Sequence, residues 1–444
     1  MPDDAAAEAH DPYAAFRHPA FWVYLSSYVL AVFSSAMMSF AARFEVNELT
    51  RHSSQGAAYY LGLLGAVGAI PVIGLSLFAG HVADRFNRKH VLLLTQVVLT
   101  ICPALFALLA WRGGLTVWTV YAIVLANGVA LTFGRPARSA LISTLVPRSV
   151  FSNAVTWNSS FAETSAILGP ALAGPITAGA GLEVALAVAA ACMGLCLAIS
   201  LLLPSGRVDD DKPREQLNWH SLLAGFRFVF RTRLLFATMS LDLFAVLFGG
   251  ATYLMPVFAD RLGVGPSGLG WMQAAPGVGA LSMALLQAHR PPFRRAGRAM
   301  LIAVAGFGIA TIIFGLSQSL LLSLGMLVLM GAFDNVSVIV RHSLVQLLTP
   351  DPMRGRVSAV NQVFIGSSNE IGGFESGMTA KLFGSPVASV VVGGVAVIGI
   401  VGIIAARFPE VRRLGRLRDV AAAPDDPLAP MPTRDLTQLD SAPK

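Results

Sequence analysis

Five acidic side chains lie inside long apolar runs of this sequence: Glu163, Asp242, Asp334, Glu370 and Glu375. If those runs cross a bilayer, a charge near their centre costs about 2.5–3.5 kcal/mol on insertion scales, so each acid is a candidate functional group. Buried carboxylates can take up and release protons near neutral pH. The pattern therefore predicts proton transfer coupled to solute or substrate movement, with Asp242 and Glu370, near mid-depth of their runs, as the first candidates.

Each carboxylate could instead be structural, in a hydrogen bond or an ion pair between helices. Asp334 lies nearer one end of its run and could pair with Arg341 or Arg138. Arg43 and Glu45 close the first run, where they are either coupling candidates or an ion pair at its external end. The residue types alone leave these alternatives open.

The elements that must hold these side chains are membrane-spanning helices. Of the 444 residues, 55% are hydrophobic and only 13% are charged, and the mean hydropathy is +0.65. A soluble protein carries roughly a quarter charged residues, and a spanning helix needs about 20 apolar ones. Runs of that length occur at 20–42, 57–80, 90–111, 115–137, 153–178, 183–204, 234–258, 267–288, 299–317, 319–341, 357–383 and 386–407. We therefore predict an all-α membrane protein with twelve transmembrane helices.

The chain repeats itself around a polar linker. Shifting residues 138–174 by 203 positions aligns them with 341–377, and LGLLGA (61–66) matches LGWMQA (269–274). This pattern predicts two pseudo-symmetric six-helix halves related as parallel repeats. The predicted parts are a cytoplasmic N-terminal segment (1–19), a first half (20–204), a cytoplasmic linker with an amphipathic helix (205–233), a second half (234–407) and a largely disordered cytoplasmic tail (408–444).

The distribution of positive charge predicts the orientation. All but five of the 32 Lys and Arg residues fall on or next to one side of the predicted spans. The exceptions are Arg43, Arg51, Arg112, Arg261 and Lys381. By the positive-inside rule that side is the cytoplasm, and twelve spans leave both termini there. The net charge of +7 is thus explained by topology, without a nucleic-acid partner.

One charged turn, AGHVADRFNRKHVLL (79–93), separates the second and third runs. It fits the pattern G-x-x-x-D-R-x-[GN]-R-[RK] through Gly80, Asp84, Arg85, Asn87, Arg88 and Lys89. Asn87 stands where a left-handed backbone favours glycine. The turn resembles the cytoplasmic signature loop of the major facilitator superfamily, and this resemblance implies a gate that locks the two halves on the cytoplasmic side. Asp84 would face the N-terminus of the eleventh span near 357–361. The alternative is that the charges of this turn only set the topology and form no gate.

A second motif, SAILGPALAGP, lies in the fifth run and consists of Ser165, Gly169, Pro170, Ala173 and Gly174. Small residues let helices approach closely, and Pro170 removes a backbone hydrogen bond and predicts a kink. The motif is similar, in part, to an element of drug–proton antiporters in that superfamily, which implies antiport. The buried arginine of a further family motif is missing, because Asn127 and Gly128 occupy its place in the fourth span.

Two longer stretches, 241–270 and 340–377, resemble the siderophore-exporter-like and drug-efflux branch, typified by enterobactin exporters. The resemblance covers about residues 15–415. Members of that branch often carry an acid where this chain has Gly373, so the resemblance implies that one coupling carboxylate is absent here.

Motifs of other function classes are missing from the sequence. It has no G-x-x-x-x-G-K-[ST] phosphate loop, H-E-x-x-H or G-x-S-x-G, so we predict no enzyme, no metal and no cofactor beyond a proton gradient. The prediction is a monomeric transporter in the bacterial inner membrane that exports small amphipathic molecules by proton antiport, with Tyr28, Tyr121 and Phe244 in its cavity wall. The alternatives are an importer or lysophospholipid flippase on the same fold, or a membrane receptor or scaffold.

Overall fold

The chain is built of helices, and no strand occurs in the part that the structure describes. The structure is a computed structural model that describes residues 11–147, 149–204, 219–291, 293–350 and 353–417. The first long helices are α1 (Pro19–Thr50), α2 (Ala57–Arg85), α3 (Arg88–Trp111), α4 (Val117–Leu145), α5 (Phe151–Ala180) and α6 (Leu182–Leu201). The later ones are α8 (Arg233–Phe248), α9 (Ala251–Leu262), α10 (Gly265–Ala288), α11 (Ala296–Leu316), α12 (Leu320–Leu348), α13 (Arg354–Leu382) and α14 (Pro386–Arg407).

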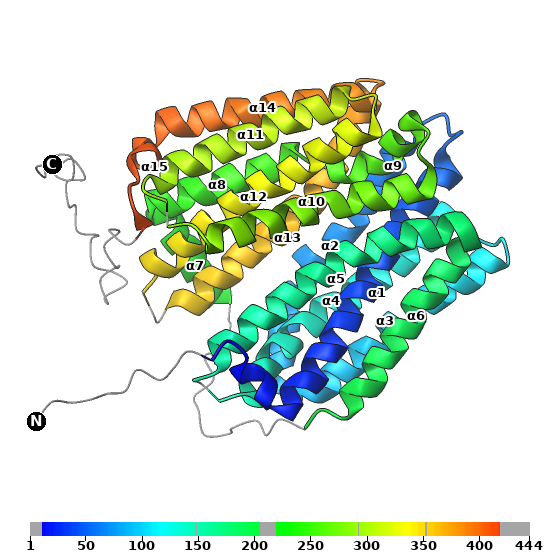
Figure 1. Cartoon of the computed structure of the whole chain (residues 1–444), viewed down its shortest axis with the longest axis horizontal. Helices are drawn as coiled ribbons and strands as arrows, with labels where there is room; N and C mark the ends of the chain where they lie inside the picture. The colour runs from blue at the N-terminus through cyan, green and yellow to red at the C-terminus, as the bar shows by residue number, and fades with distance from the viewer. Residues whose placement is uncertain (1–10, 148, 205–218, 292, 351–352, 418–444) are drawn as a thin grey trace, which may run out of the picture.

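These helices form two bundles, α1–α6 and α8–α14 (Figure 1). Apolar runs become helices because hydrocarbon offers the backbone no hydrogen-bond partner outside the segment. Ten segments of the described chain are long and apolar enough to cross a membrane. The equally long α5 and α13 are more polar, and they pack on the opposite bundle, α5 on α10 and α13 on α2. This arrangement is consistent with twelve crossings in two halves.

The seventh crossing differs from the single run predicted at 234–258. It is made of two helices, α8 and α9, that break at Gly249 and Gly250. A Cβ on Gly250 would lie 2.5 Å from the carbonyl oxygen of Gly372 and 2.6 Å from Ser376 Oγ. The backbone of α13 therefore packs directly into the break, which requires residues without side chains.

The turn between α2 and α3 also differs from expectation. Asn87 has φ −59°, so it does not adopt a left-handed backbone. Its side-chain oxygen accepts a hydrogen bond from the backbone N–H of Lys89, 2.9 Å away, and caps the start of α3. Asn occupies this position because it is among the best N-cap residues, rather than as a substitute for glycine.

Short helices flank the bundles: η1 (Ala14–Arg17), α7 (Trp219–Arg231) and α15 (Pro409–Arg413). The helix α7 lies in the segment expected to form an amphipathic helix, whereas residues 1–10, 205–218 and 418–444 of the predicted end and linker segments lie outside the described residues. The start of the predicted disordered tail is folded. Gly415 and Leu414 accept backbone hydrogen bonds from Ala296 and Gly297, at 3.0 and 3.3 Å, because the first N–H groups of α11 have no partner within the helix.

Glycine pairs bring the two bundles together at one end. A Cβ on Gly62 of α2 would lie 2.8 Å from Cα of Gly377 on α13, and a Cβ on Gly174 of α5 would lie 2.9 Å from Cα of Gly270 on α10. We call this end, where α1 leads into α2 and α9 into α10, the closed end. The sequence repeat aligns Gly174 with Gly377 and Gly62 with Gly270, so the two crossings are pseudo-symmetric equivalents.

We expect Gly377→Val to open the closed end, because the added side chain has no room against Gly62. Overpacking costs about 1–3 kcal/mol, enough to shift a two-state equilibrium about tenfold. The readout is the maleimide labelling rate of a cysteine placed at Ala58, which is 8% exposed, in a chain without its three native cysteines. Gly399→Val is the control, since no heavy atom lies within 4 Å of a Cβ there. Equal labelling of the two variants would contradict the prediction.

Candidate functional site

Polar contacts join the bundles at the closed end. Arg51 Nη2, at the end of α1, lies 2.5 Å from Asp260 Oδ1 of α9, and Asn47 Nδ2 donates to Asp260 Oδ2 at 2.6 Å. The hydrogen bond with Asp260 raises the pKa of the Arg51 guanidinium. Lys381 Nζ of α13 donates to Gln55 Oε1 at 3.1 Å. These contacts all join one bundle to the other.

The bundles diverge away from the closed end (Figure 1). Along α2 and α13, a Cβ on Gly366 would still lie 2.9 Å from Val72 Cγ1, but a Cβ on Gly80 would have no neighbour within 4 Å. Arg85 is exposed, and the side chain of Asp84 lies outside the described part of the structure. We call this end, which carries the α2–α3 turn, the open end.

The other basic residues of the charged turn bind within their own bundle. Arg88 Nη1 donates to the carbonyl of Ala140 at 3.5 Å. Lys89 Nζ donates to the carbonyls of Leu201 and Leu203 at 2.8 and 2.5 Å. In this conformation Arg88 and Lys89 tie α3 to α4 and to the end of α6.

A polar network near the closed end crosses between the bundles. Arg43 of α1 donates to Ser39 at 2.9 Å and to Gln273 of α10 at 3.3 Å, and its guanidinium carbon lies 5.0 Å from the ring centre of Tyr253 on α9. Tyr253 Oη donates in turn to Glu370 Oε2 of α13. Arg43 therefore does not form the ion pair with Glu45 that the sequence allowed. Apart from Ser39, its partners Gln273 and Tyr253 lie on the opposite bundle.

Gly373 is explained by the same network. A Cβ on Gly373 would lie 2.6 Å from Cγ of the Tyr253 ring. Any side chain at this position would therefore displace Tyr253 and its hydrogen bond to Glu370. The absence of an acid at position 373 and the presence of the phenol are physically linked.

A buried ion pair joins α8 to α12 inside the second bundle. Arg341 Nη1 bonds to Asp242 Oδ2, and the two residues are only 3% and 5% exposed. Arg341 thus pairs with Asp242 and not with Asp334, which decides an alternative that the sequence left open. In hydrocarbon each charge would otherwise be left without a partner.

Asp334 lies beside this pair across a small void. The void has a volume of about 10 Å³ and is lined by Asp242, Asp334, Ser337 and Phe333 among others. It can hold no more than a single water molecule. Asp242 and Asp334 therefore line one small void, and Glu370 does not.

Arg138 of α4, the repeat partner of Arg341, has aromatic neighbours instead of an acid. Its guanidinium carbon lies 5.0 Å from the ring centre of Tyr28, and its carbonyl accepts from Tyr24 Oη at 3.4 Å. Among the described residues, Arg138 Nη1 is buried without a hydrogen-bond partner. Equivalent arginines of the two halves thus have different partners: Arg341 pairs with an acid, and Arg138 lies beside an aromatic ring.

Of the three aromatic residues predicted for the cavity wall, the structure contradicts one. Tyr121 is buried in the core of the first bundle, where Tyr121 Oη donates to the carbonyl of Tyr60 at 2.6 Å, so its placement in a cavity wall is wrong. Phe244 is exposed and stacks on Phe248. An aromatic side chain fits a core as well as a cavity, so residue type could not separate these cases.

The remaining acids do not converge on one place. Glu163 is exposed on α5, Glu45 is half-buried on α1, and Glu375 is half-buried on α13 beside Ser376, whose Oγ lies 3.5 Å away. The structure therefore brings Glu370 together with Arg43, and Asp242 with Asp334, and separates the other candidates.

The small residues of the α5 motif serve helix contact. Ser165, Gly169, Pro170, Ala173 and Gly174 are all buried. A Cβ on Gly169 would lie 3.1 Å from the carbonyl of Phe33 on α1, whereas Gly174 meets α10 of the other bundle. One motif thus packs α5 on both sides.

Sequence reasoning missed Tyr253, Gln273 and Asp260. All three lie in the stretch after the Gly249–Gly250 break. The adjacent glycines in an apolar run were the available signal, because a discontinuous helix in a membrane is tolerated where it lines a functional region.

A family model described as "Transmembrane secretion effector" matches residues 10–436. The chain belongs to this family of major facilitator transporters. Transporters of the family are not enzymes, which confirms that prediction. This chain is a multi-pass membrane transporter.

Curated relatives of this transporter include enterobactin exporters EntS. Those of Shigella boydii serotype 18 and Escherichia coli O1:K1 are each 27% identical over 343 residues, which cover 77% of this chain and 81% of the relative.

Solved structures share the fold at lower identity. Nucleoside transporter NupG has a TM-score of 0.64 at 12% identity, covering 87% of this chain and 99% of that one. An inward-facing, unoccupied bacterial homologue of the lysosomal transporter Spinster has a TM-score of 0.64 at 15% identity, covering 91% and 98%.

We expect Asp242→Asn to destabilise the transporter strongly, because it leaves Arg341 buried and unpaired. Breaking a buried pair on one side costs about 3–5 kcal/mol. The measurement is the free energy of unfolding of the purified chain in a fixed detergent.

Asp260→Asn is the matched control, since its partner Arg51 is exposed and such pairs contribute about 0–1 kcal/mol. The double variant Asp242→Asn, Arg341→Gln should regain part of the loss. Equal stability of the two single variants would contradict the assignment.

Proposed function

We propose that this transporter exports a small amphipathic organic molecule, such as a siderophore, drug or metabolite, in exchange for protons by alternating access. Its family description and its similarity to proteins named enterobactin exporters support export. The observation that carries the proton part of the proposal is the Arg43–Tyr253–Glu370 network between the bundles.

We propose that the protein acts as a monomer in the bacterial inner membrane, with the open end and both termini in the cytoplasm. The distribution of Lys and Arg supports this orientation. The closed end then faces the periplasm, and the conformation is inward-facing. The proton gradient would supply the energy without a bound cofactor: one proton moving through 100 mV is worth about 2.3 kcal/mol, nearly two decades of solute concentration.

Glu370 is the acid best situated to couple protonation to opening. Its carboxyl group accepts from Tyr253 in the second bundle and packs on the first, since a Cβ on Gly68 of α2 would lie 3.0 Å from its Cδ. Glu370 has no ion-pair partner among the described residues, whereas Asp242 is already neutralised by Arg341. A change of charge at Glu370 therefore alters contacts between the bundles, while one at Asp242 alters a contact inside a bundle.

The proposed cycle follows from these contacts. In the inward-facing state Glu370 releases its proton to the cytoplasm and the solute binds between the bundles. Outward opening separates Arg43 from Gln273, releases the solute and exposes Glu370 to the periplasm. Protonation there removes the negative charge, and the empty carrier returns to the inward-facing state.

Tyr28 and Arg138 are the proposed anchor for the solute. An aromatic ring beside a cation with a free donor offers one apolar wall and one polar contact, the usual composition of a site for an amphipathic molecule. On the cytoplasmic side, Asp84 and Arg85 would latch the bundles when the carrier faces outward.

We expect Glu370→Gln to abolish stimulation of transport by a pH gradient while leaving exchange of solute for solute intact, because the amide keeps the shape of the side chain but cannot carry a proton. The assay is uptake of labelled enterobactin, the molecule named for the relatives, into inverted vesicles with an imposed pH gradient. Metabolites that accumulate in a deletion strain are the next probes.

Glu410→Gln, which changes an acid outside the spans, is the control and should keep the stimulation. Full stimulation in the Glu370 variant would refute the assigned role. The same vesicle assay separates the alternative functions. An importer or a flippase would not load the vesicles with solute in a proton-dependent way. A receptor would move no solute.

A further inference from the structure

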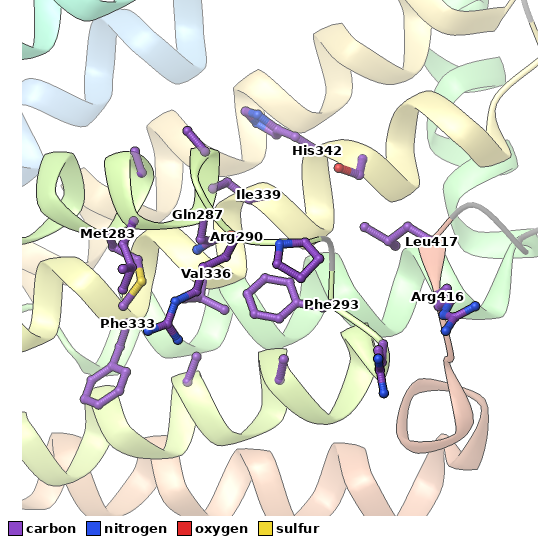
Figure 2. A pocket seen from close by; sticks show the side chains of 18 of the residues that line it. Met283, Gln287, Arg290, Phe293, Phe333, Val336, Ile339, His342, Arg416 and Leu417 are labelled. Atoms are coloured by element: carbon purple, nitrogen blue, oxygen red, sulfur yellow. The ribbon is translucent and has the colours of Figure 1, made fainter.

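A pocket in the second bundle has no part in the proposed cycle. It has a volume of about 1550 Å³, and its walls come from α10, α11, α12 and the segment after α15 (Figure 2). It lies at the open end, where α10 finishes and α11 begins. The backbone hydrogen bonds from the start of α11 to Leu414 and Gly415 fix the segment that adds Arg416 to the wall.

The pocket is lined by three cationic side chains. Arg290, Arg294, Arg416 and His342 line it, and its described lining contains no acidic residue. Within the described chain none of the three arginines forms an ion pair. Gln287 Nε2, also in the wall, is buried without a hydrogen-bond partner. These donors are complementary to an anion with several oxygen atoms.

Most of the remaining lining is apolar, and at Ile302 it is continuous with the membrane-facing surface. Ile302 of α11 lines the pocket and is 69% exposed. At helical spacing it continues the row formed by Ile309, Ile313 and Leu316, which are also exposed. A row of exposed large apolar residues along a spanning helix faces lipid. The pocket therefore opens toward the bilayer at the depth of the headgroups.

We propose that this pocket binds an anionic phospholipid from the adjoining leaflet of the bilayer. The arginines hold the phosphate, which planar guanidinium groups can bind in a bidentate way. The acyl chains follow the row that begins at Ile302. Basic pockets between transmembrane helices are known to bind anionic headgroups, and the apolar wall distinguishes a lipid from a free anion.

The test uses the purified full chain and native mass spectrometry with phosphatidylglycerol or phosphatidylcholine of identical acyl chains. We expect phosphatidylglycerol to bind in preference. The double variant Arg290→Gln, Arg294→Gln should weaken that binding about 30-fold, given the contribution of each cation to binding anionic lipid. Arg412→Gln, Arg413→Gln is the matched control, since it removes the same charge from exposed residues of α15 outside the pocket.

Three outcomes would overturn the proposal: equal binding of both lipids, equal losses in both double variants, or displacement of phosphatidylglycerol by glycerol 1-phosphate at the same concentration. The last result would identify a site for free anions. Should the pocket variant fail to fold, photoreactive phosphatidylglycerol on the unchanged chain decides: cross-links at α10 and α11 around the pocket support the site, and cross-links confined to other helices refute it.

Discussion

The constraint on which this structure depends is that hydrocarbon cannot solvate a charge or a backbone polar group. Polar atoms inside the spans must therefore find partners within the protein, and Arg138 Nη1 is an exception among the described residues. Two of the acids satisfy this constraint differently: Asp242 is neutralised by Arg341 within one bundle, whereas Glu370 accepts a hydrogen bond from the Tyr253 phenol and contacts the opposite bundle. The first arrangement holds a bundle together, and the second is the basis of the proposed proton coupling between the bundles.

At the glycine pairs of the closed end the bundles approach through backbone rather than through side chains. Lipid is as apolar as leucine, so burying leucine between helices gains little in a membrane, and close packing of small residues takes over. Gly62 with Gly377 and Gly174 with Gly270 bring main chains together at the closed end. Such contacts have no side chains to interlock, which suits the proposed alternating access.

Helices could be predicted from the sequence because each depends on residues close in the chain. The family and the internal repeat could be predicted because both follow from comparing residue patterns, without any knowledge of side-chain contacts. Side-chain partners could not be predicted from the sequence. Arg341 could reach Asp334 along its own helix, yet it pairs with Asp242 on α8, because helix rotation and packing decide which carboxylate it faces. Tyr253 was missed because its position depends on the Gly249–Gly250 break. Tyr121 was wrongly assigned to a cavity wall because aromatic residues occur both in cores and in cavity walls.

The link between Gly373 and Tyr253 bears on the proposed proton coupling. A carboxylate at position 373 would lie three residues, about one helical turn, from Glu370 on the same face of α13. Two neighbouring acids repel one another when both are charged. With glycine there, the ring of Tyr253 fills the space and its hydroxyl group reaches Glu370. In the proposed cycle, proton coupling then depends on a single carboxylate, Glu370, with a neutral hydrogen-bond donor, and Arg43 on the opposite bundle is the nearby cation.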